Sequence, residues 1–142
     1  MVLIDTNVLL YATGGAHPLR EPCRGIVRAV GQSRLPACIT DVVLAEFVHA
    51  RARRSSRAEA AELAASFIAI VDEVVVPDPN VRDRALGLYA TTDQLSSNDA
   101  LIAAMAIEHG MTLLSADQDF VEARGLRLVA PDSDEARALI RS

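Results

Sequence analysis

The chain has 142 residues, of which 51% are hydrophobic and 23% charged, and this composition predicts one soluble globular domain over residues 1–142. A formal net charge of −5 argues against a protein that holds nucleic acid by bulk electrostatics, but it does not exclude a nuclease with a cluster of metal-binding carboxylates. No apolar run is long enough to cross a membrane and no signal-peptide pattern is present, so we expect a cytoplasmic protein.

Apolar runs alternate with helical periodicities along the chain. Strands are predicted at residues 2–4, 37–39, 74–76, 111–114 and 126–129. Helices are predicted at residues 6–12, 19–32, 41–53, 58–71, 80–90, 99–109 and 133–141. Because strands that alternate with helices form parallel sheets, we expect a three-layer α/β/α fold with a central parallel sheet of four to five strands.

The first strand ends in a carboxylate. Val2 to Ile4 form a short apolar run, typical of a strand buried on both faces, and Asp5 follows where a helix begins. Ligands of open α/β sheets bind at the carboxyl ends of strands, which makes Asp5 a candidate ligand. Asp5 is an equally good cap for the helix, and its position alone does not separate these interpretations.

Another carboxylate lies in apolar surroundings on the helix at 41–53, for which Thr40 is a good N-cap. Glu46 has Val43 and Ala50 three and four positions away, on its own face. A buried carboxylate is costly unless it is paired or coordinates a metal. Glu46 is therefore a candidate ligand, unless it lies at the edge of the buried stripe or pairs with an arginine.

A basic cluster lies at and after the end of this helix and consists of Arg51, Arg53, Arg54 and Arg57. Arginines are favourable at the C-terminal end of a helix, and most such clusters are only solvated helix ends. Contact with an RNA backbone is the alternative interpretation.

Asp99 lies in the first turn of the helix at 99–109, for which Ser97 or Asn98 is a suitable cap. An acid at this position stabilises the helix dipole, so a purely structural role explains Asp99 as well as ligation does. The strand at 111–114 then runs into Ser115, Asp117 and Asp119, which repeats the opening order of apolar strand, hydroxyl and carboxylate. An ordinary acidic turn is the alternative there.

These acidic residues converge in a parallel sheet. Asp5 and Asp117 would lie at one edge, and Glu46 and Asp99 are on helices that could face it. Clustered carboxylates raise each other's pKa until a cation arrives. Oxygen ligands without nearby histidine or cysteine suit Mg²⁺ or Mn²⁺ and not Zn²⁺. A divalent ion can activate water and stabilise a phosphate, so we expect phosphodiester hydrolysis.

Other residue types narrow the chemistry. The chain contains no lysine, which excludes a P-loop NTPase. Receiver domains and haloacid-dehalogenase-like phosphatases also have acidic strand-end pockets, but both use a lysine beside the phosphorylated aspartate. Cys23 and Cys38 lack metal-ligand spacing and are expected to be reduced and buried.

Four segments, in this order, resemble the PIN domain: Asp5-Thr6-Asn7, Glu46 in its apolar helix, Ser97-Asn98-Asp99, and residues 115–120. Each motif is weak alone, but the ordered set spans nearly the whole chain. A lone, short PIN domain is most similar to the VapC-type toxins of bacterial toxin–antitoxin pairs. The resemblance implies a single PIN-like nuclease domain: a Mg²⁺-dependent endoribonuclease, usually a homodimer, that a VapB-type antitoxin silences.

The same resemblance implies roles for individual residues. Carried over, the metal-binding and catalytic quartet is Asp5, Glu46, Asp99 and Asp117. Asp119 would be an accessory acid, and Thr6 and Ser115 would support the site by hydrogen bonds. The family commonly has threonine where Ser115 stands, and the hydroxyl is kept.

Two alternative functions stay open. One is a PIN-type nuclease for RNA maturation or decay that is not a toxin. The other is an inactive PIN-like module whose acidic pocket binds a partner's arginine, although the complete acidic set argues against this. Four apolar residues could line a groove for an antitoxin segment, or could belong to the core or a homodimer surface: Val42, Phe47, Phe67 and Ile68.

Overall fold

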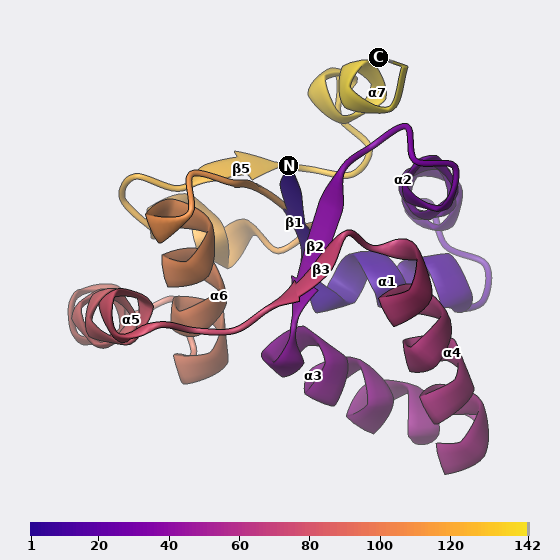
Figure 1. Cartoon of the computed structure of the whole chain (residues 1–142), viewed down its shortest axis with the longest axis horizontal. Coiled ribbons are helices and arrows are strands. Elements are labelled where there is room, and N and C mark those ends of the chain that lie inside the picture. Colours follow the sequence, from indigo (N-terminus) through magenta and orange to yellow (C-terminus); the bar gives the residue numbers. More distant parts are fainter. Residues whose placement is uncertain (142) are drawn as a thin grey trace.

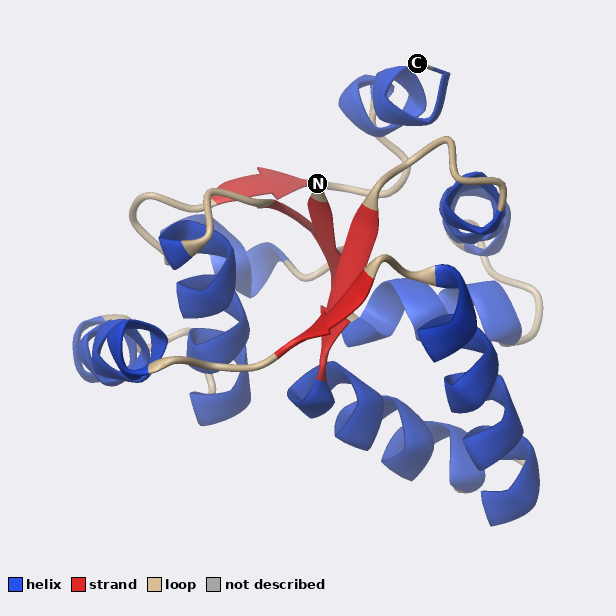
Figure 2. Ribbon diagram, viewed as in Figure 1, coloured by secondary structure: helices blue, strands red, loops and turns tan. Residues whose placement is uncertain are grey.

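A computed structural model describes residues 1–141 of the chain. Within these residues the strands form one five-stranded sheet in the order β3-β2-β1-β4-β5, and every neighbouring pair is parallel (Figures 1 and 2). The strands are β1 (Val2–Ile4), β2 (Ala37–Thr40), β3 (Glu73–Val75), β4 (Thr112–Leu114) and β5 (Arg127–Val129). The expected parallel sheet is confirmed.

Helices cover both sides of this sheet. They are α1 (Thr6–Thr13), α2 (Arg20–Gly31), α3 (Asp41–Ala52), α4 (Arg57–Ile70), α5 (Pro79–Thr91), α6 (Ser97–Glu108) and α7 (Asp134–Arg141), with a 3₁₀ helix, η1, at Gln118–Glu122. Figure 1 shows α5 and α6 on one side of the sheet and α1, α2 and α4 on the other, which confirms the three-layer α/β/α architecture. Within residues 1–141 no helix has the length and apolar character that a bilayer crossing requires.

The strand order places a ligand crevice beside β1. The chain builds β1, β2 and β3 in one direction and then crosses back to add β4 and β5 on the other side of β1. Ligands of open α/β sheets bind where the strand order reverses, outside the carboxyl ends. Because Ile4 is in register with Leu114, β1 and β4 end at the same level. The residues that follow these strands, Asp5 and Ser115, therefore meet at the crevice.

Side-chain caps set the helix starts, and one predicted cap is wrong. Thr40 caps α3 as expected, with its Oγ1 accepting from the backbone N of Val43 at 3.1 Å. Helix α6 is capped by Ser96, whose Oγ accepts from the backbone N of Asp99 at 3.1 Å, and not by Ser97 or Asn98. The helix consequently begins at Ser97, two residues earlier than expected, so Asp99 does not have to act as its cap.

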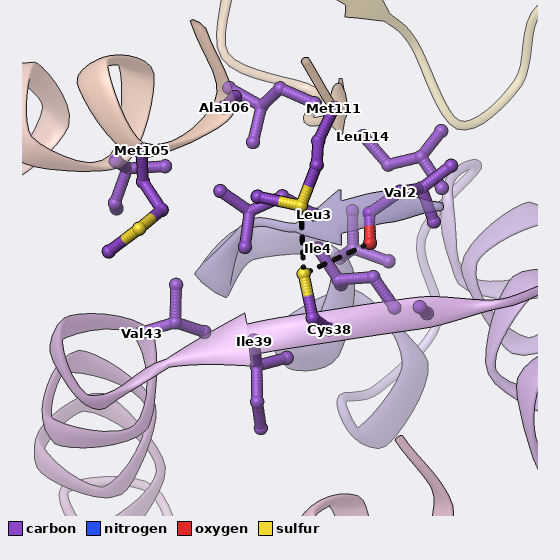
Figure 3. Packing of buried hydrophobic residues seen from close by; sticks show 14 of the residues in the cluster. Val2, Leu3, Ile4, Cys38, Ile39, Val43, Met105, Ala106, Met111 and Leu114 are labelled. Carbon is purple, nitrogen blue, oxygen red and sulfur yellow. Dashed lines mark hydrogen bonds between the residues drawn. The ribbon is translucent and has the colours of Figure 1, made fainter. Parts of the chain in front are cut away.

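The core is built on β1, whose three residues are buried. Figure 3 shows Leu3 and Ile4 of this strand among side chains from β2 and α6. The Cys38 thiol lies 3.5 Å from the carbonyl oxygen of Val2 and 3.2 Å from the sulfur of Met111. Both cysteines are free and buried, as expected, and burial raises the pKa of each thiol to about 12. They therefore stay protonated and unreactive.

Two of the four residues considered for a partner groove are core residues. Phe47 and Phe67 are 0% and 4% exposed, and their rings meet edge to face with centroids 5.2 Å apart. The two rings form part of the buried contact between α3 and α4, since edge-to-face packing buries both of them. Ile68 is 47% exposed. A hollow of about 840 Å³ does lie along α3 and α4, but its lining includes Val48, Ala52, Arg53, Arg57 and Ala61 instead.

Candidate active site

Asp5 is fixed at the carboxyl end of β1 by three hydrogen-bond donors. It is 4% exposed, and its Oδ1 accepts from the backbone N of Thr6 at 2.8 Å. Its Oδ2 accepts from Asn7 Nδ2 at 2.9 Å and from Ser115 Oγ at 2.6 Å. Asp5 thus caps α1, and the same bonds hold its carboxylate in one orientation. Asp5 can therefore cap α1 and also contribute its carboxylate to the candidate site.

Asn7 and Ser115 cross-link α1 to the loop after β4. Asn7 Nδ2 also donates to Ser115 Oγ at 3.1 Å, and Asn7 Oδ1 accepts from the backbone N of Ala116 at 3.0 Å. Ser115 Oγ accepts from the backbone N of Asp117 at 3.0 Å. Asn7 was not among the predicted site residues. The available signal was its position two residues after Asp5, because an amide can donate and accept at once.

Thr6 connects Asp5 to Glu46. Its Oγ1 donates to Glu46 Oε1 at 3.0 Å, across 40 positions of sequence. Glu46 is half-buried on α3. Within residues 1–141 no arginine forms an ion pair with Glu46, so the interpretation of Glu46 as an arginine partner lacks support. Thr6 instead places this second carboxylate beside the first.

The remaining acids reach the same place from α6 and from the loop after β4. Asp99 is half-buried in the first turn of α6, and the negative charges of Asp117, Glu46 and Asp119 act on it. Asp117 is half-buried and accepts from the backbone N of Asp119 at 2.9 Å, whereas Asp119 is exposed. The charges of Asp99 and Glu46 act in turn on Asp5. Four carboxylates and the exposed Asp119 therefore form one acidic cluster.

Ionisation of this cluster is costly in the absence of a cation. Burial, helped by the charges of Asp99 and Glu46, raises the pKa of Asp5 to about 6. The bonds of Asp5 to Ser115 and Thr6 oppose this shift. Burial also raises the pKa of Asp99 to about 6, while a hydrogen bond with Ser96 opposes the shift. Both groups are ionised near neutral pH, where a positive charge would stabilise them.

The cluster fits a hard divalent cation by its chemistry. Its candidate donor atoms are carboxylate, hydroxyl and amide oxygens, which Mg²⁺ and Mn²⁺ prefer. Among residues 1–141, no three histidine, cysteine, aspartate or glutamate side chains already stand in a joint metal-binding arrangement. Mg²⁺ does not require one, because it usually keeps several waters and uses one or two carboxylates together with phosphate oxygens.

The raised pKa of Asp99 predicts a pH-dependent gain in stability for Asp99→Asn without divalent metal. Between pH 4 and 6 the folded protein holds a proton on Asp99 that the unfolded chain, with an ordinary pKa of 3.8, releases. Wild-type stability is therefore lost as pH rises through this window, and the neutral asparagine avoids the loss. Between pH 4 and pH 6, we expect the unfolding free energy of Asp99→Asn to gain about 1–2 kcal/mol relative to that of wild type. This value is reduced to allow for solvent screening of the half-exposed carboxylate.

Urea unfolding at pH 4, 5, 6 and 7 in chelator measures this difference. Asp83→Asn is the matched control, because Asp83 is exposed on α5, outside the acidic cluster. Its difference from wild type should stay constant with pH. A constant difference for Asp99→Asn as well would contradict the raised pKa.

Comparisons with known proteins agree with this architecture. A sequence model of the PIN domain matches residues 2–126. Ribonuclease VapC7 of Mycobacterium tuberculosis is 41% identical over 135 residues, which cover 94% of this chain and 93% of that protein. Ribonuclease VapC13 of the same organism is 31% identical over 135 residues, which cover 92% and 100%.

A solved structure shares the fold. The crystal structure of VapBC2 from Rickettsia felis, bound to a DNA fragment from their promoter, matches with a TM-score of 0.73 and 20% identity, covering 92% of this chain and 98% of that one. The resemblance read from the sequence motifs is confirmed. Since the family model covers most of the chain and a relative with 41% identity covers nearly all of it, this chain belongs to the PIN domain family.

Proposed function

We propose that this protein is a metal-dependent endoribonuclease, the toxin of a VapBC-like toxin–antitoxin pair, in which residues 1–142 form a single nuclease domain. The acidic cluster at the switch point of the sheet carries the proposal. Three donors fix Asp5, and the charges of Glu46 and Asp99 act on it. Relatives named VapC ribonucleases, aligned over more than nine-tenths of the chain, support the same activity.

In this proposal the acidic quartet binds Mg²⁺ or Mn²⁺, with Asp5 and Asp99 as the closest ligands and Glu46 and Asp117 completing the set. A cation held there would supply positive charge for the phosphate and lower the pKa of a water for hydrolysis of the phosphodiester bond. The chain's own task is positioning. Ser115 and Asn7 hold the Asp5 carboxylate, and Thr6 holds Glu46. Asp119 is an accessory acid at the exposed rim.

The cluster also suggests how a partner protein could silence the enzyme. A guanidinium is cationic and matches carboxylates bidentately, so an arginine of a VapB-type antitoxin can enter the cluster in place of the metal. Several solved structures with this fold are toxin–antitoxin complexes, including one from Klebsiella pneumoniae with a TM-score of 0.67 and 20% identity. We propose a VapB-type antitoxin as the partner, and a homodimer as the toxin's own assembly.

Expression in a bacterial host, together with RNA cleavage by the purified protein, tests the proposal. We expect expression alone to arrest growth, and co-expression of the proposed VapB-type antitoxin to restore it. RNA cleavage without growth arrest would instead indicate a maturation or decay nuclease. Neither cleavage nor growth arrest would indicate an inactive binding module. Asp83→Asn, an exposed change on α5, should behave as wild type in both assays.

A further inference from the structure

A second hollow adjoins the acidic cluster. It has a volume of about 430 Å³ and lies at the C-terminal end of α1, where its lining includes Asn7, Tyr11, His17 and Arg54. Asn7 is the residue that also donates to Asp5. Asn7 therefore connects the hollow, which lies along α1, to the acidic cluster. Its volume falls within the roughly 300–1,000 Å³ of small-ligand sites.

A fixed pair of rings lines this hollow. Tyr11 and His17 are stacked, with ring centroids 4.4 Å apart and an interplanar angle of 27°. Tyr11 is half-buried and His17 is exposed. His17 Nδ1 also accepts from the backbone N of Leu19 at 3.0 Å, so two contacts hold the imidazole ring. An exposed ring held in this way is suited to stacking against an unpaired nucleobase.

Arg54 brings positive charge to the same hollow. Its side chain is exposed, and within residues 1–141 it forms no ion pair, whereas Arg51 pairs with Glu59 at 2.5 Å. Arg53 and Arg57 line the other hollow, along α3 and α4. The basic cluster is thus divided between the two hollows, and Arg54 is the member that lines the same hollow as Asn7. A guanidinium there can offset the repulsion between the acidic cluster and RNA phosphates.

We propose that this hollow binds the nucleotide next to the cleaved phosphodiester, with its base stacked on the Tyr11–His17 pair and its phosphate on Arg54. The inference rests on the proposed endoribonuclease function and adds the residues that would hold the nucleotide beside the cleaved bond. A paired base has both faces stacked inside the helix, so only an unpaired nucleotide can enter. Base stacking tolerates any sequence, because every base has an aromatic face.

Two substitutions at His17 separate the ring from its hydrogen bond. His17→Asn keeps an acceptor for the backbone N of Leu19, because asparagine bonds the backbone two residues on, but it removes the ring. His17→Phe keeps a ring and removes the acceptor. Both changes are made in Asp99→Asn protein, and binding of a fluorescein-labelled 12-nucleotide single-stranded RNA is followed by fluorescence anisotropy in Mg²⁺. We expect about tenfold weaker binding for His17→Asn and less than about threefold for His17→Phe.

Equal losses in the two variants would assign the effect to loop structure and overturn the inference. Unchanged binding in both would overturn it as well. If RNA affinity is unchanged while the proposed VapB-type antitoxin binds more weakly, the hollow belongs to a protein partner, and the RNA assignment is wrong.

Adjacent arginines provide the matched pair for the phosphate contact. Arg54→Ala should lower the slope of log affinity against log salt by about 0.7, the value for one phosphate contact on a single strand. Arg53→Ala removes the same charge from the adjacent residue, which lines the hollow along α3 and α4 instead. This change should leave the salt slope of RNA binding unchanged. Equal slopes for the two variants would mean that bulk charge is responsible, which overturns the subsite.

An RNA-cleavage assay of the wild-type protein separates the nucleotide subsite from the proposed endoribonuclease function. If wild type cleaves RNA while the His17 and Arg54 variants bind as tightly as their parent, the subsite is wrong and the endoribonuclease function stands. If wild type cleaves no RNA, the endoribonuclease function is wrong. Ring-dependent RNA binding would then still support a nucleotide site in the hollow.

Discussion

Asp99→Asn is expected to lower kcat/KM for RNA cleavage by at least about 10³-fold, equivalent to about 4 kcal/mol, while the protein stays folded. Asp99 is half-buried, and the charges of Asp117, Glu46 and Asp119 act on it. Removing its charge weakens the proposed attraction for a divalent cation. The fold should survive, because Ser96 Oγ accepts from the backbone N of residue 99, and the substitution keeps this bond.

Cleavage of a labelled single-stranded RNA in Mg²⁺, together with thermal unfolding, measures both parts of this result. Asp83→Asn makes the same chemical change at an exposed position on α5 and should leave activity within about twofold. Near-wild-type activity in Asp99→Asn would remove Asp99 from the catalytic set. A large drop in melting temperature would support a structural role at the helix start instead.

Asp5→Asn should also abolish cleavage, but it is a less clean test. The Asp5 carboxylate accepts from Thr6, Asn7 and Ser115. An asparagine there directs its own NH₂ donor at one of these donors, and an unpaired buried donor costs about 1–3 kcal/mol. Relief of charge repulsion and loss of hydrogen bonding therefore oppose each other at Asp5. At Asp99, relief of charge repulsion is the larger of the two effects.

The sequence predicted the parts of the site that depend on strand ends. Parallel strands of similar length end at one edge, so a carboxylate directly after a buried strand can be placed from the pattern alone, as for Asp5. Glu46 was found by the cost of a carboxylate on an apolar helix face. Both arguments use only local sequence and the alternation of strands with helices.

The cross-links of the site could not be predicted in the same way. The bonds of Asn7 to Ser115 and to the backbone N of Ala116 span more than 100 positions and depend on how the loop after β4 approaches α1. The cap of α6 was misplaced because Ser96, Ser97 and Asn98 are all good cap residues, and the backbone path decides among them. Phe47 and Phe67 needed the packing of α3 on α4 to be identified as core.

Removal of divalent metal is expected to abolish RNA cleavage completely, and Mg²⁺ or Mn²⁺ should restore it. The acidic cluster offers oxygen donors, and burial with like charges raises the pKa of Asp5 and Asp99 to about 6. Such a cluster attracts a small hard cation and has no soft ligand for Zn²⁺. Full activity after exhaustive chelation would contradict the proposed mechanism.

Stability gives a second measurement of the same site, independent of activity. A ligand that binds only the folded protein, at about 100 times its Kd, stabilises it by about 2.7 kcal/mol. We therefore expect Mg²⁺ at pH 7 to raise the unfolding free energy of wild type and of Asp83→Asn, but to have much less effect on Asp99→Asn. NaCl at matched ionic strength controls for screening. An equal Mg²⁺ effect in all three proteins would place the cation elsewhere, because only Asp99→Asn alters the acidic cluster.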